Sequence, residues 1–147
     1  MDFIHYLSGR DVESVAMMTD ARGEDRPLEE TAIGTLRLGE DAFATLVATR
    51  HAGSAANGFT VYGTEGFMQA EGTIGPTATG RVRMVVGGTT TENSYQGRDP
   101  FRAEVESFNQ SIQEGGVPDA SGLDGLRSVR VTQALLESAR TGRTVRL

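Results

Sequence analysis

The chain has 147 residues, a net charge of -6 and no cysteine, and all 14 of its basic residues are arginine. This length suits one domain with its own core, and the lack of cysteine excludes disulfides and thiolate metal sites. The lack of lysine excludes Schiff-base and Walker-type chemistry, and the negative charge argues against a nucleic-acid partner. Because no apolar run is long enough for a signal peptide or a membrane span, we expect a cytoplasmic protein without a membrane partner.

The first third of the chain predicts a short helix followed by antiparallel strands. Residues 1–7 are apolar enough for helical turns, which Gly9 would end. A polar, charged segment at 20–30 lies between the first strand and the second. The last two strands flank Gly39-Glu40-Asp41, a three-residue segment with a glycine that is typical of a β-hairpin turn. Their side chains alternate along the strand with the period of two that a sheet requires. The three predicted strands are residues 11–19, 31–38 and 42–50.

The middle of the chain predicts further strands joined by glycine turns. Gly63-Thr64-Glu65-Gly66 connects two of them, and we interpret it as a turn rather than a phosphate loop, since no helix follows it. Gly87-Gly88 ends the last of them, and a polar stretch at 89–98 leads onward. Apolar side chains occur at both odd and even positions in 42–50 and 81–86, so they lie on both faces of each strand. This pattern favours a sheet covered on both faces. The three strands are residues 59–62, 67–71 and 81–86.

Two helices and a closing strand are predicted at the C-terminus. Asp99-Pro100 supplies a cap and a first-turn proline, and Gly115 ends this helix. Ser121 or Asp124 would cap the second helix, which stops at Gly142, and residues 144–147 form the strand. Each helix has one apolar stripe. The stripes are Phe101, Val105, Phe108 and Ile112, and then Leu126, Val129, Ala134 and Leu135.

Strands followed by helices predict an α+β fold: an open, mostly antiparallel sheet of six or seven strands, with the two C-terminal helices packed on one face. We expect a single domain over residues 1–147, because the sequence contains no linker, internal repeat or low-complexity tract.

The sequence of the C-terminal stretch resembles the end of the Gfo/Idh/MocA oxidoreductases. That family typically closes with an aromatic residue, a Glu, a Phe, a Gly-x-x-Pro turn, then Asp-Gly and Ser-Ala-x-x-Gly before the final strand. The residues that match are Phe101, Glu104, Phe108, Gly115 to Pro118, Asp124-Gly125, Ser138-Ala139 and Gly142. Asp2, Leu7 and Gly9 resemble the end of the family's His-x-x-Asp-x-x-x-x-Leu-x-Gly motif, whose His would precede residue 1.

The resemblance implies the C-terminal domain of a dehydrogenase for sugars, inositols or other polyols, which associates with a second copy through its sheet. The family's Gly-x-Gly-x-x-Gly turn is absent, as are its catalytic Lys, Asp and His. We therefore expect no cofactor in this chain, with NAD or NADP only in a full-length relative, and no hydride transfer by the chain alone. A fragment or a truncated gene product would explain this, and a separate chain with the Rossmann domain is a further possible partner.

Substrate contacts are expected just before and at the start of the first C-terminal helix, where the family binds its polyol. Tyr95, Arg98 and Phe101 are the candidates, with Glu92 and Asn93 as neighbouring polar groups. Phe101 also begins an apolar stripe, so burial in the core is the alternative for it. We expect no catalytic, cofactor-binding or metal-binding residues.

Two other classes of function remain open. One is a stand-alone binding or scaffold module that associates through its open sheet. The other is an enzyme of a different kind, using paired carboxylates or His51 beside Arg50. An exposed strand end is the favoured interpretation of His51, and a locally packed helix residue that of His5.

Overall fold

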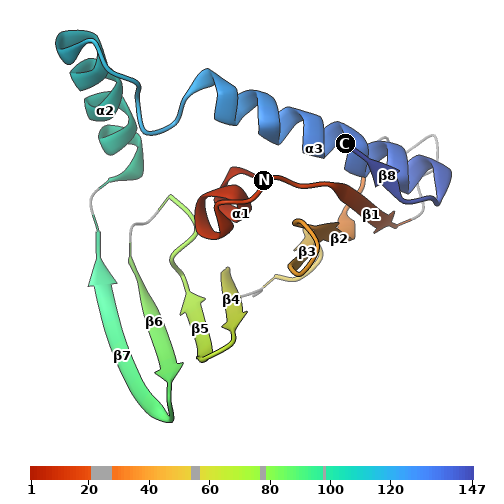
Figure 1. Ribbon diagram of the computed structural model, residues 1–147, viewed down its shortest axis with the longest axis horizontal. Helices are drawn as coiled ribbons and strands as arrows, with labels where there is room; N and C mark the ends of the chain where they lie inside the picture. The colour runs from red at the N-terminus through yellow and green to blue at the C-terminus, as the bar shows by residue number, and fades with distance from the viewer. Residues whose placement is uncertain (21–27, 54–56, 77–78, 98) are drawn as a thin grey trace. The chain divides into compact units, whose positions relative to one another are not determined.

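The computed structural model describes residues 1–20, 28–53, 57–76, 79–97 and 99–147. These residues form two compact units, one of Met1–Gly53 with Ala120–Leu147 and the other of Ser54–Asp119. Each unit contains one antiparallel sheet of four strands, and Figure 1 labels their elements.

The first unit is a sheet with the order β3-β2-β1-β8, in which every neighbouring pair is antiparallel. The hairpin predicted around Gly39-Glu40-Asp41 is present, and its strands pair from Thr31 opposite Thr49 to Arg37 opposite Phe43. The short last strand joins the free edge of the first. The elements are α1 (Asp2–Ser8), β1 (Ser14–Thr19), β2 (Thr31–Arg37), β3 (Phe43–Thr49), α3 (Gly122–Thr141) and β8 (Val145–Arg146).

Helix α3 packs on one face of this sheet and forms the core with it. Leu36 and Val15 are each only 1% exposed. Ala134 and Leu135 of the predicted stripe are buried, but Leu126 and Val129 are exposed. The helix instead faces the sheet with residues that recur at intervals of three and four. The buried hydrophobic residues of this core are Val15, Met17, Leu36, Leu38, Val131, Ala134 and Leu135.

The second unit is a meander in which consecutive strands pair in the order β4-β5-β6-β7. The segment Gly63 to Gly66 is the predicted turn, with these two glycines paired across the hairpin. The polar stretch after Gly87-Gly88 is a strand that the sequence did not predict. Both glycines have positive φ, 55° and 79°, as a two-residue hairpin turn requires. The elements are β4 (Gly58–Gly63), β5 (Gly66–Glu71), β6 (Thr79–Val86), β7 (Thr89–Gln96) and α2 (Pro100–Glu114).

The helix ends follow the local sequence. The carboxylate of Asp99 accepts hydrogen bonds from the backbone amides of Phe101 and Arg102, at 2.9 and 3.3 Å. Both candidate caps of α3 take part in one capping box, since Ser121 caps the helix while Asp124 bonds back to Ser121. The predicted glycine ends are confirmed, because each of the three helices ends at a glycine in the left-handed conformation.

The α+β class and the antiparallel pairing are confirmed, but the prediction of one open sheet was wrong. Within the described residues, eight strands form two sheets of four. Alternation shows which residues form strands, whereas the pairing of strand edges depends on contacts far apart in sequence. Packing on a sheet is observed for α3. The stripe of α2, from Phe101 to Ile112, remains exposed. Most of the predicted loop 20–30 lies outside the described residues.

Candidate functional site

The structure describes two of the three predicted substrate contacts. Tyr95 lies on β7 opposite Gly80 and is 51% exposed, and Phe101 lies in the first turn of α2 and is 65% exposed. Arg98 is outside the described residues. The exposure of Phe101 removes the alternative that this ring fills the core. Substrate binding by the three residues stays a prediction.

The neighbouring polar groups are separated by the pleat of β7. Side chains alternate between the two faces of a strand, so Asn93 shares a face with Tyr95 while Glu92 lies on the other. There, the carboxylate of Glu92 pairs with Arg81 of β6 at 3.3 Å. Of the two predicted partners, the structure therefore brings only Asn93 to the Tyr95 side.

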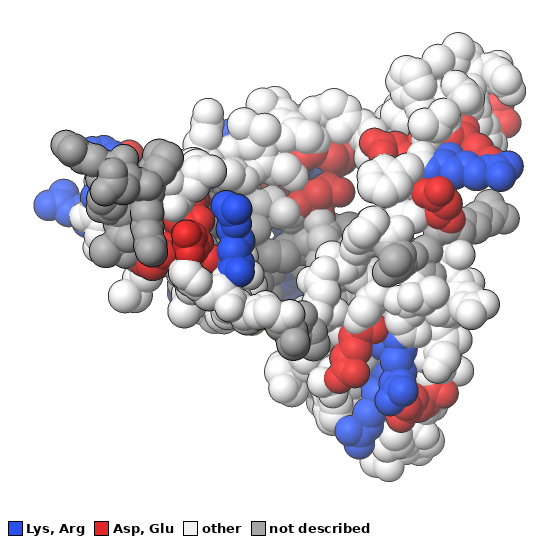
Figure 2. Space-filling model, turned by 180° about the vertical axis from the view of Figure 1, so that it is seen from behind, with Lys and Arg blue, Asp and Glu red and all other residues white. Residues whose placement is uncertain are grey.

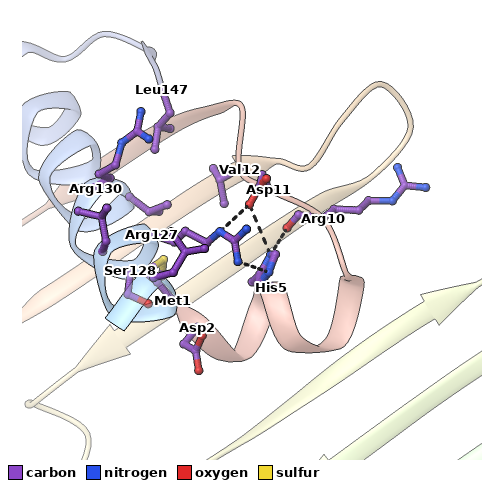
Figure 3. A pocket seen from close by; sticks show the side chains of 13 residues that line it. Met1, Asp2, His5, Arg10, Asp11, Val12, Arg127, Ser128, Arg130 and Leu147 are labelled. Atoms are coloured by element: carbon purple, nitrogen blue, oxygen red, sulfur yellow. Dashed lines mark hydrogen bonds and ion pairs between the residues drawn. The ribbon is translucent and has the colours of Figure 1, made fainter. Parts of the chain in front are cut away.

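A pocket of about 290 Å³ lies within the first unit, between α1, the segment after it and α3. Figure 3 shows His5 of α1, Asp11 and Arg127 of α3 pointing toward one another at its centre. Apolar side chains of α3 and the N-terminal segment complete the wall. This volume is close to the lower end of the range for small-molecule sites, roughly 300 Å³.

A polar network joins the elements around this pocket. The Nδ1 atom of His5 lies 2.9 Å from the carbonyl oxygen of Arg10, which can only accept, so we assign the ring proton to Nδ1. The Nε2 atom then accepts a hydrogen bond from Arg127 Nη1 at 3.2 Å. The same guanidinium pairs with Asp11 at 3.4 Å and with Asp124 at 3.3 Å.

This network holds charges in place and leaves His5 without a free base position. The hydrogen bonds from Ser121, with the nearby guanidinium of Arg127, hold the pKa of Asp124 below its ordinary value. His5 uses one ring nitrogen on Arg10 and the other on Arg127, as expected for a locally packed residue. Sequence reasoning missed Arg127, although its spacing from Asp124 puts both on one side of a helix.

His51, the candidate for a different enzyme, lies just beyond the end of β3. It is exposed, its Nε2 pairs with the carboxylate of Glu30 at 2.5 Å, and its backbone amide donates to Thr49. These contacts join the ends of neighbouring strands, which agrees with the interpretation of an exposed strand end.

The N-termini of α2 and α3 do not fit the pyrophosphate of a dinucleotide. Such a group binds to free backbone amides at a helix N-terminus after a glycine turn. In α2 the carboxylate of Asp99 already accepts from these amides, and in α3 the capping box does so. The glycine turn at 63–66 joins two strands instead.

Neither a metal site nor a membrane span is found in the described part of the chain. No three His, Asp or Glu side chains there are grouped so that they could hold a metal ion. None of the described helices is both long and apolar enough to cross a membrane.

Charged side chains of both signs lie close together on the surface. Figure 2 shows small groups of acidic and basic side chains separated by uncharged surface. Among the described pairs are Arg102 with Glu106 at 2.7 Å and Arg140 with Glu137 at 2.8 Å. The absence of a nucleic-acid partner stays a prediction.

Comparison with known proteins identifies the family. The family described as "Oxidoreductase family, C-terminal alpha/beta domain", of the Gfo/Idh/MocA group, matches residues 1–147. A curated relative, D-xylose 1-dehydrogenase (NADP(+)) 2 of Haloferax volcanii, is 28% identical over 74 residues, which are 50% of this chain and 23% of that protein.

Solved structures show the same fold. Aldose-aldose oxidoreductase from Caulobacter crescentus, complexed with glycerol, matches with a TM-score of 0.86 and 24% identity, over 99% of this chain and 44% of that one. UDP-N-acetylglucosamine 3-dehydrogenase GnnA from Acidithiobacillus ferrooxidans matches with a TM-score of 0.79 and 18% identity, over 93% and 43%. The chain spans less than half the length of these relatives. It belongs to the Gfo/Idh/MocA oxidoreductases, as a C-terminal alpha/beta domain of that family.

Proposed function

We propose that this chain is the substrate-side domain of an NAD(P)-dependent oxidoreductase that acts on a sugar, inositol or other polyol. The family match over all 147 residues is the observation that supports it. A dinucleotide-binding domain, in the same chain or in a separate one, supplies the cofactor. The chain itself contributes hydroxyl recognition through Tyr95, Arg98 and Phe101, and the exposed rings of Tyr95 and Phe101 are available as an apolar wall.

A chimaera tests this function. We expect the domain, joined to a Rossmann domain of the family, to restore NAD(P)-dependent turnover of a polyol. In that chimaera Tyr95→Phe, which removes one hydroxyl, should raise KM by about fivefold, because a hydrogen bond contributes roughly 1 kcal/mol. Arg98→Ala should weaken binding at least as much.

Tyr62→Phe is the matched control. Tyr62 is also an exposed tyrosine on a strand of the same sheet, and it lies on the opposite face from Tyr95, so KM should stay unchanged. Equal KM values in all variants would exclude the predicted substrate contacts. A folded chimaera that never turns over a polyol would instead favour the binding or scaffold module.

We further propose that the chain forms homo-oligomers through the sheet face of its first unit that α3 leaves uncovered. Met18, Ile33 and Val47 are paired across three neighbouring strands, in one row. Their side chains are 78%, 50% and 67% exposed. Such a row of apolar side chains in water is unfavourable, and a second copy of the same face would bury it.

Val47→Asp should shift the chain to a monomer in light scattering across a concentration series, because it places a charge at one end of the buried row. Val117→Asp is the control, since Val117 is an even more exposed valine in the other unit. It should leave the assembly intact. A wild-type chain that stays monomeric throughout the series would contradict the proposed interface.

A further inference from the structure

We propose that the pocket between α1 and α3 binds a small organic carboxylate, with Arg130 as its charged contact. This site does not depend on the proposed oxidoreductase function. It lies entirely within the first unit, and neither Tyr95 nor Phe101 lines it. Three observations support the proposal: a guanidinium that has no partner among the described residues, an apolar strip beside it and the position of the acidic groups.

The first observation is that Arg130 has no hydrogen bond or ion pair to any described residue, although it lines the pocket. Arg127, one turn earlier, differs, because His5, Asp11 and Asp124 already occupy its guanidinium. A guanidinium offers five N–H donors in a planar fork that matches a carboxylate. Arg130 is therefore the group available for a ligand, while Arg127 fixes the wall of the pocket.

The second observation is the helical spacing of the lining residues. Leu123, Leu126 and Arg130 recur at intervals of three and four, which puts them on one side of α3. The two leucines are 56% and 55% exposed, so the pocket presents apolar surface that no described residue covers fully. A carbon chain attached to the carboxylate would bury this surface, whereas inorganic phosphate could not.

The third observation concerns the acidic groups that would repel an anion. Asp11 is paired with Arg127, so its charge is compensated. Figure 3 shows Asp2 at the opposite end of the pocket from Arg130, which lies beside Leu147. A carboxylate head at the Arg130 end therefore lies farthest from Asp2, and the terminal carboxylate of Leu147 is the remaining negative group beside it. The carbon chain would then extend along Leu126.

Titration with pentanoate, pentanol and inorganic phosphate tests the proposal at constant ionic strength. We expect saturable binding of pentanoate, with shifts of the Leu123 and Leu126 methyl resonances. Pentanol lacks the charge and phosphate lacks the carbon chain, so each should bind at least about tenfold more weakly. Phosphate binding as tight as that of pentanoate, or methyl resonances that do not move, would overturn the proposal.

Arg130→Gln should weaken pentanoate binding about tenfold or more while the circular dichroism spectrum is unchanged, since this exposed side chain supports no described contact. Arg140→Gln is the matched control. Arg140 is an exposed arginine on the same helix that pairs with Glu137 and does not line the pocket. Its replacement should leave binding intact, and equal losses in the two variants would overturn the assignment to Arg130.

Discussion

Replacing Gly66 by alanine is expected to lower the free energy of unfolding of the second unit by about 3 kcal/mol, the upper part of the usual overpacking range. The residue begins β5 and pairs with Val86 of β6. A Cβ atom at this position would lie 1.8 Å from the carbonyl oxygen of Val85 and 2.8 Å from its carbon. Because both contacts are with backbone atoms, the new methyl group can fit only if the two strands separate.

Gly63→Ala is the matched control, since Gly63 is the partner of Gly66 across the same turn. A Cβ atom there would meet nothing closer than 3.9 Å, so the free energy of unfolding should change by less than about 1 kcal/mol. Denaturant titrations followed by circular dichroism give both values. If the two alanine variants are equally stable, the close approach of β5 and β6 at this point is refuted.

The same turn illustrates how far the sequence could predict the fold. The glycines at 63 and 66 and the alternation around them were enough to predict a hairpin, because turn chemistry is local. The requirement for glycine at 66, however, comes from the neighbouring strand β6, about twenty residues later in the chain. Helix ends were predicted for the same local reason, from Asp99, Ser121 and Gly142.

What the sequence could not predict depends on contacts between distant residues or on weak patterns. The strand β7 was missed because its polar side chains, all exposed, show no apolar alternation. The two-sheet arrangement depends on which edges pair, such as β8 with β1. In the candidate pocket, His5 and Arg127 are 122 residues apart, so no local spacing indicates that they meet.

The family resemblance at Ser138-Ala139-x-x-Gly142 has a physical explanation in the core. The hydroxyl of Ser138 accepts a hydrogen bond from the backbone amide of Met17 at 3.0 Å and donates one to the carbonyl oxygen of Arg143 at 2.6 Å. One side chain thus ties β1 to the end of α3 and to the turn before β8. Ser138 is only 1% exposed, so no water can replace these bonds at the hydroxyl.

Ser138→Ala should therefore lower the free energy of unfolding of the first unit by about 1–3 kcal/mol, the cost of a buried amide left without a partner. Most of the loss comes from Met17, because Arg143 is exposed and its carbonyl can bond to water. Amide hydrogen exchange at Met17 should accelerate in the same variant.

Ser128→Ala is the matched control for Ser138→Ala. Ser128 lies on the same helix, and its buried hydroxyl oxygen has no hydrogen-bond partner among the described residues. Removing an unpaired buried hydroxyl costs nothing in hydrogen bonds, so the stability should stay the same or rise slightly. A Ser138→Ala variant as stable as Ser128→Ala, with unchanged exchange at Met17, would show that the hydroxyl of Ser138 does not hold β1 to α3.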